Sequence, residues 1–239
     1  MLRPRLKLAR SAGSIQLFPY LGGKTRIARR YPAPRYSLII EPFAGGAAYS
    51  LCHACRHPRL AVHLNDMNAD VMRVWRFIQQ ADPRAITALP NLAVGAKIAD
   101  IPHLSDEERL LLGLWANTVA GGRLCQQVSG WSRKAWHARK IGLARTVSLL
   151  RHWQITFGDY LMLENVEATW FIDPPYQGFV GYTHGGSGVD YARLAEWCRA
   201  RRGQVIVCER EGAAWLPFTP LVRTRGQTNT PYWEMIYTQ

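Results

Sequence analysis

Blocks of apolar and polar residues alternate along the chain in a way that predicts strands and helices in turn. Apolar runs of strand length occupy residues 37–41, 60–66, 154–159, 169–173 and 204–209. Helical patterns cover residues 47–57, 69–80 and 189–203, and the last of these helices is expected to end at Gly203. Near-continuous apolar strands that alternate with helices are typical of a mostly parallel sheet with helices on both faces. The pattern therefore predicts an α/β fold.

Residues 83–152 break this alternation. A capped, leucine-rich helix is expected to begin at Ser105, and a second helical pattern covers residues 144–153. Between them, residues 121–140 are rich in Gly, Arg, Trp and Gln, a mixture that suits phosphates and base edges. We interpret the whole segment as a helical insertion in the sheet domain, and a purely structural helical cap is the alternative.

The composition favours a polyanionic partner. The 239 residues contain 30 Lys and Arg against 17 Asp and Glu, which gives a formal net charge of +13. Arginine dominates this excess, and its guanidinium pairs with phosphate and stacks on bases. Nucleic acid is therefore the first partner to expect, and a solvated basic surface from an arginine-biased genome is the alternative.

Several other classes of protein are disfavoured. No apolar run reaches membrane-spanning length, and the basic N-terminus lacks the apolar core of a signal peptide. Five cysteines, an odd number, indicate a reducing compartment. Cys52 and Cys55 have CxxC spacing but no second ligand pair at suitable spacing, so no metal is expected. The GGKT segment fails as a P-loop because Phe18 stands where the first glycine belongs.

Acidic residues follow several of the predicted strands. Glu41, Asp66, Asp159 and Asp173 each stand at or just after a strand end, and ligands bind beyond the carboxyl ends of parallel strands. Asp66 alone is weak support for a site, because it or Asn68 is also a suitable cap for the helix over residues 69–80. Taken together, these acids predict one ligand site at a single edge of the sheet.

The tetrapeptide DPPY, residues 173–176, is the most informative of these strand ends. Two prolines fix φ and remove backbone donors, so the corner holds one carboxylate, free carbonyl groups and one ring in a rigid arrangement. Such a corner suits a pocket for a flat ligand that carries an amino group, and an ordinary turn is the alternative.

At this point the chain resembles a known family, the Dam-type (D12) class of S-adenosylmethionine-dependent DNA adenine-N6 methyltransferases. The resemblance runs from Phe18 to Gln239, with a gap over residues 83–152. Its carriers are FPYLGGK, IIEPFAGGAA, HLNDMNAD, ITFGDY, WFIDPPY, QVIVCE and YWEMIYT. It implies a Rossmann-like methyltransferase sheet with a helical insertion.

The domain organisation follows from this resemblance. Residues 17–82 and 153–239 are expected to form the catalytic domain, and residues 83–152 are expected to form the insertion that binds DNA and recognises its target. Residues 1–16 are expected to form a basic, flexible arm. The protein is expected to be bacterial or phage-encoded, and to act in the cytoplasm on double-stranded DNA.

The resemblance also implies roles for single residues. Tyr20 and Lys24 would contact the cofactor, and the lysine would face its methionine end. The loop from Pro42 to Gly46 would surround that end, Asp66 would bind the ribose hydroxyls, and Asp159 would lie beside the adenine of the cofactor. The full set expected to bind S-adenosylmethionine comprises Tyr20, Lys24, Glu41, Pro42, Phe43, Gly45, Asp66, Asp159, Tyr160 and Asp173.

The same resemblance assigns the catalytic corner. Asp173 and the carbonyl of Pro174 would accept hydrogen bonds from the target amino group, with Pro175 completing the corner. Tyr176 would stack on the flipped-out base, since a duplex hides the amino group and an aromatic platform offsets lost stacking. Independently of the resemblance, the basic and amide side chains of the insertion predict contacts with DNA from Arg123, Gln126, Gln127 and Arg133.

The sequence departs from the family pattern at several points. Ala47 replaces the last glycine of the FxGxG loop, Pro19 replaces a lysine that often precedes the aromatic residue, and the insertion lacks a clear asparagine-rich segment. Recognition of GATC therefore does not carry over, and a relaxed or very short target fits the few predicted base-reading groups. N4-cytosine methylation, adenine methylation in ribosomal RNA, and a catalytically silent nucleic-acid-binding module remain as alternatives.

Overall fold

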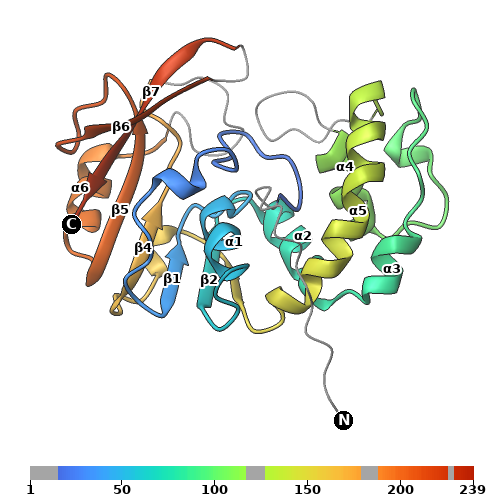
Figure 1. The fold of residues 1–239 in the computed structure, drawn as a ribbon, viewed down its shortest axis with the longest axis horizontal. Coiled ribbons are helices and arrows are strands. Elements are labelled where there is room, and N and C mark those ends of the chain that lie inside the picture. The colour runs from blue at the N-terminus through green and yellow to red at the C-terminus, as the bar shows by residue number, and fades with distance from the viewer. Residues whose placement is uncertain (1–15, 117–126, 179–187, 226–228) are drawn as a thin grey trace.

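The computed structural model describes residues 16–116, 127–178, 188–225 and 229–239, and its centre is a mixed sheet (Figure 1). The strand order among the described residues is β3-β2-β1-β4-β5-β7-β6. Strands β1 to β5 are mutually parallel, whereas β7 is antiparallel to both β5 and β6. The strands are β1 Leu38–Glu41, β2 Ala61–Asp66, β3 Gln154–Phe157, β4 Ala168–Ile172, β5 Gly203–Arg210, β6 Thr219–Arg225 and β7 Pro231–Thr238. This confirms the α/β class and the Rossmann-like methyltransferase sheet.

The helices fall where most of the capping signals indicate. The Asn68 side chain accepts hydrogen bonds from the backbone of Asp70 and Val71, and Ser105 and Glu108 form a reciprocal capping box. The helices are α1 Ala48–Ala54, α2 Ala69–Gln80, α3 Pro83–Ala88, α4 Asp106–Ala116, α5 Gly130–Leu150 and α6 Tyr191–Arg199, with 3₁₀ turns η1 Ala28–Arg30, η2 Ile98–Asp100 and η3 Tyr160–Met162.

Alternation of side chains along the strands buries both faces of the sheet. In β1, Ile39 belongs to the apolar cluster that contains α1, α2, α4 and α5, whereas its neighbour Ile40 belongs to the cluster that contains α6. Trp170 and Phe171 in β4 divide between the two faces in the same way. The sheet is therefore covered by helices on both faces, as the apolar runs predict.

The helices of residues 83–152 share the core of the sheet. Trp115 of α4 donates its indole N–H to the carbonyl of Leu17, and Trp136 of α5 donates to the carbonyl of Pro90. Both indoles lie in the same apolar cluster as Ile39. In Figure 1, α3, α4 and α5 gather at the end of the molecule opposite β6 and β7.

Three local expectations differ from the structure. Helix α5 runs from Gly130 to Leu150, so it begins well before the helical pattern expected over residues 144–153. Helix α3 is an addition, with Asp82 as its cap and Pro83 in its first turn. Gly203 does not end a helix: α6 ends at Arg199, and Gly203 opens β5 with φ +100°, where a Cβ atom would collide with the carbonyl oxygen of Ala168.

The strand order places a switch point between β1 and β4. Chain order runs outward from β1 through β2 to β3 on one side, and from β4 to β5 on the other. Ligands of doubly wound sheets bind outside the carboxyl ends of the strands at such a point. Glu41 ends β1 and Asp173 follows β4, so both acids lie at this edge.

No helix in the described part of the chain is both long and apolar enough to span a membrane.

Candidate active site

A cavity of about 430 Å³ lies at this edge of the sheet, which is within the size range of small-molecule sites. It brings together most of the residues that the sequence singles out. Tyr20, Lys24, Glu41, Phe43, Gly45, Asp66, Asp159, Tyr160, Asp173 and Pro175 all line it. Pro42, Pro174 and Tyr176 belong to the same loops but do not line the cavity.

The loop after β1 approaches the ring of Tyr20 so closely that a residue with a Cβ atom would collide with it at position 45. Gly45 has φ +44°, and a Cβ atom there would lie 2.6 Å from Cδ1 of Tyr20. Its backbone is held on both sides, since its N–H donates to Asp66 (2.8 Å) and its carbonyl accepts from the buried indole of Trp75 (2.9 Å). Ala47, which replaces a family glycine, also has φ +44°, so this departure lies at a left-handed position.

Asp66 connects this loop with helix α2. One carboxylate oxygen accepts from the N–H of Gly45 and the other from the N–H of Asn68, both at 2.8 Å. Asn65 beside it reaches the carbonyl of Gly158 at 2.9 Å. Asp66 therefore lines the cavity and also fixes the backbone of the glycine loop.

An aromatic pair bounds another part of the cavity. The rings of Phe43 and Tyr160 lie 5.2 Å apart between centroids, and both side chains are half-buried. Asp159 precedes Tyr160 and accepts from the N–H of Leu161 at 2.9 Å, which caps the η3 turn. This wall offers apolar ring surface beside a carboxylate, a combination that suits a flat heterocycle with an amino group.

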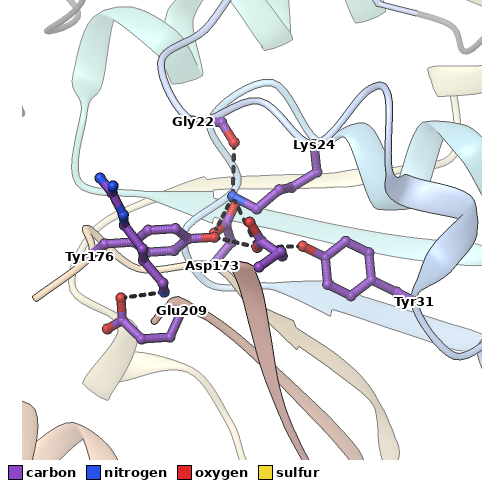
Figure 2. A network of polar contacts seen from close by, with 8 residues as sticks. Gly22, Lys24, Tyr31, Asp173, Tyr176 and Glu209 are labelled. Atoms are coloured by element: carbon purple, nitrogen blue, oxygen red, sulfur yellow. Dashed lines mark hydrogen bonds and ion pairs between the residues drawn. The ribbon is translucent and has the colours of Figure 1, made fainter. Parts of the chain in front are cut away.

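Lys24 and Asp173 form a close ion pair at the centre of the site. Lys24 Nζ lies 2.8 Å from both carboxylate oxygens of Asp173 and 2.8 Å from the carbonyl oxygen of Gly22. Figure 2 shows the two side chains pointing toward one another. The lysine side chain is 5% exposed and that of Asp173 is 19% exposed, so the pair is largely shielded from solvent and its attraction is stronger than at the surface.

The Tyr176 ring is buried under the same lysine. Lys24 Nζ lies 4.7 Å from the ring centroid, and the residue is only 6% exposed. Its phenol donates to Oε1 of Glu234, which also accepts from Tyr31 at 2.6 Å. The expected stacking face of Tyr176 is thus covered by Lys24 in this state.

Sequence reasoning missed three residues that hold the DPPY corner. Tyr191 of α6 donates to the carbonyl of Pro175 (2.8 Å), and Glu209 of β5 accepts from the N–H of Gln177 (3.2 Å). Glu234 of β7 accepts from Tyr176. Glu209 and Glu234 lie in the two distal family motifs, which is the one sequence signal that could have singled them out.

Two carboxyl groups of the cavity have raised pKa values. Burial raises the pKa of Asp173 to about 6, an effect that the Lys24 ammonium opposes and that Glu234 reinforces. Burial also raises the pKa of Glu41 to about 8, opposed by its hydrogen bond from the N–H of Ser50 (2.8 Å). Perturbed acids that line a cavity are typical of functional sites.

The residues expected to contact DNA divide between described and undescribed parts of the chain. Arg123 and Gln126 lie outside the described residues, as does most of the arm expected over residues 1–16. Gln127 is exposed, and its side chain donates to the carbonyl of Gly95 (3.2 Å). Arg133 belongs to the first turns of α5.

No group of three or more potential metal ligands occurs in the part of the chain that the structure describes.

The N-terminal segments that line this cavity also match a known family. Residues 20–102 match the family model of D12 class N6 adenine-specific DNA methyltransferases. This match confirms the resemblance, and it supports methyl transfer to adenine in DNA as the general activity. The D12 match contains Tyr20, Lys24, the glycine loop and Asp66, whereas residues 173–176 lie beyond it. No curated protein sequence matches the chain.

Proposed function

We propose that the protein transfers a methyl group from S-adenosylmethionine to N6 of an adenine flipped out of double-stranded DNA. One observation carries the proposal: the carboxylate of Asp173 and the glycine loop at residues 45–46 line the same cavity. An acceptor for an amino group therefore lies beside a loop that admits close approach of a ligand. The D12 family match supports the same reaction.

The lining of the cavity fits S-adenosylmethionine. A Cβ atom at Gly45 would close the approach between the loop and Tyr20, and the acids around the cavity complement a sulfonium cation. We propose that Phe43 and Tyr160 hold the adenine with Asp159, that Asp66 accepts from the ribose, and that Lys24 and Tyr20 serve the methionine end. The bound cofactor would supply an electrophilic methyl group.

The remaining residues would position the target amine. Asp173 and the carbonyl of Pro174 accept from its two N–H bonds, so that the nitrogen lone pair is directed at the methyl group. In the structure, Lys24 donates to both oxygens of Asp173 and covers the ring of Tyr176. The target base can therefore enter only after Lys24 has moved from Asp173.

The activity should depend on the ionisation of Asp173. A protonated Asp173 loses its negative charge and presents an O–H donor where the target amine needs an acceptor, and its pKa in the free protein is about 6. We expect kcat/KM to fall tenfold per pH unit below about pH 6 and to level off above it, because kcat/KM reports groups of the free enzyme. The measurement is tritiated methyl transfer to DNA between about pH 5 and pH 8. A flat profile over that range would contradict this role.

We propose that residues 83–152 contact DNA, with Arg133 as one phosphate ligand. Arg133 stands in the first turns of α5, in a chain of net charge +13. Replacement of Arg133 by alanine should weaken DNA binding and reduce the slope of log affinity against log salt by about 1, because one counterion fewer is released. The control is Arg199→Ala, an exposed arginine of α6 that lies outside this segment. An unchanged slope for Arg133→Ala would remove Arg133 from the interface.

One experiment tests the reaction itself. Purified protein is incubated with S-adenosylmethionine labelled in its methyl group, and with either duplex DNA or RNA. Nucleoside analysis of the products should yield N6-methyladenine from DNA. N4-methylcytosine would overturn the target base, methylated RNA alone would overturn the substrate, and cofactor binding without any product would indicate a silent binding module.

A further inference from the structure

The fully buried carboxylate of Glu234 is a feature that the proposed reaction does not use. Glu234 is 0% exposed in the middle of β7, opposite Arg210 of β5. Its Oε1 accepts from two phenols, Tyr31 at 2.6 Å and Tyr176 at 2.5 Å. Its Oε2 has no hydrogen-bond partner among the described residues. A buried carboxylate with one unpaired oxygen is costly to stability, which makes a functional role for Glu234 worth testing.

The contacts of Glu234 lead to the centre of the proposed site. Tyr176 belongs to the DPPY corner, and its phenol ends on this carboxylate. Lys24 Nζ lies 3.9 Å from Oε1, which makes Glu234 the second acid beside the lysine that pairs with Asp173. One carboxylate from the far end of the chain thus contacts both groups that flank Asp173.

We propose that Glu234 is a positioning residue for methyl transfer, which fixes the ring of Tyr176 and retains Lys24 when the target amine displaces that lysine from Asp173. This inference rests on the proposed function. A rigid phenol anchor holds the Tyr176 ring at one angle. A second carboxylate close to Lys24 keeps the ammonium paired while the oxygens of Asp173 accept from the base.

The charge of Glu234 also affects the pKa of Asp173. Glu234 adds negative charge near Asp173, which raises the pKa of Asp173. Other ionisable groups from the surrounding elements also interact with Asp173, namely Lys24, Tyr31, Glu41, Tyr176, Cys208, Glu209 and Tyr232. Only Glu234 is changed in the test. A neutral side chain at position 234 removes the negative charge that raises the pKa of Asp173, so this pKa should fall.

The test is Glu234→Gln, which keeps the shape of the side chain and removes its charge. We expect kcat to fall about 10- to 100-fold, because small displacements of positioned groups have effects of that size. The acidic midpoint of the kcat/KM profile should also move to lower pH. A side chain with a purely structural role would not produce that second change.

The matched control is Tyr31→Phe, which removes one donor to the same carboxylate without changing charge or touching the corner. It should leave both kcat and the acidic midpoint near their wild-type values. Tyr176→Phe should lower kcat, and its combination with Glu234→Gln should cost less than the product of the two single effects, since both act on one ring. These phenol variants keep the inference testable should Glu234→Gln fail to fold.

The outcomes separate this inference from the proposed function. An active wild-type protein whose Glu234→Gln variant keeps its kcat and its acidic midpoint would overturn the positioning role alone. The same holds if Tyr31→Phe and Tyr176→Phe lower kcat equally. A wild-type protein that methylates no DNA would overturn the proposed function first.

Discussion

Replacement of Asp173 by asparagine is expected to lower kcat for DNA methylation by about 10²- to 10³-fold, the usual cost of losing one well-placed polar group at a reacting centre. The asparagine keeps the size of the side chain but offers one acceptor and one donor where the target amine needs acceptors. The structure gives this side chain an unusual position, since both of its oxygens lie within 2.8 Å of Lys24 Nζ in a shielded site. The measurement is single-turnover methyl transfer with saturating cofactor and DNA.

Two controls make the result specific to the reaction. Glu164→Gln removes a carboxylate that lies outside the cavity lining and should leave kcat unchanged. Calorimetric titration with S-adenosylmethionine should show that Asp173→Asn loses one cofactor contact but still binds the cofactor, because the glycine loop and the aromatic wall are untouched. A variant that folds, binds the cofactor and retains wild-type turnover would refute the role of Asp173 as an acceptor.

Most of the sheet could be predicted because its strands are buried on both faces. The runs SLIIE, LAVHLND and QVIVCE contain more apolar residues than a half-buried strand needs, so their position is clear without any tertiary information. Strand β6 has no such signal: it reads TPLVRTR, contains a proline and is interrupted by a register shift near Pro220. Such a strand depends on its pairing with β7, which a local pattern does not reveal.

Helix α5 shows the same limit for helices. Its first half carries Arg, Lys and His around two tryptophans, of which Trp136 is buried and Trp131 is 59% exposed. The hydrogen bond of the Trp136 indole goes to the carbonyl of Pro90, which is remote in sequence. An amphipathic stripe is therefore weak over this half, and the sequence indicates a helix only from residue 144 onward.

The site could be predicted where acids follow strands, and not where partners meet across the fold. Asp66 and Asp173 stand at strand ends, so their convergence followed from the parallel sheet. The two oxygens of Asp66 prove to hold the backbone of Gly45 and Asn68, a structural duty that adds to the proposed ribose contact. Glu234 lies mid-strand, 203 residues from Tyr31, and only the folded chain brings its partners together.

Gly45→Ala is expected to have the largest effect on the cofactor. The new Cβ atom would lie 2.6 Å from Cδ1 and 2.7 Å from Cε1 of Tyr20, and the backbone has φ +44°. The loop has little freedom to yield, because the N–H of Gly45 is held by Asp66 and its carbonyl by Trp75. The Tyr20 ring must therefore move within the cavity that it lines. We expect the Kd for S-adenosylmethionine to rise about 30-fold or more, which corresponds to about 2 kcal/mol.

Two other glycines separate the causes of that effect. Gly95 has φ +84°, and a Cβ atom added there would have no atom within 4 Å, so Gly95→Ala tests backbone strain alone. It should cost about 1 kcal/mol of stability without changing the Kd. Gly46 lies in the same loop, where a Cβ atom would meet Tyr20 Cβ at 3.4 Å, so Gly46→Ala should have a much smaller effect than Gly45→Ala. Equal cofactor affinities for all three variants, measured by calorimetry, would place S-adenosylmethionine away from this loop. A selective loss at position 45 would instead show that the contact between the glycine loop and Tyr20 forms one wall of the cofactor site.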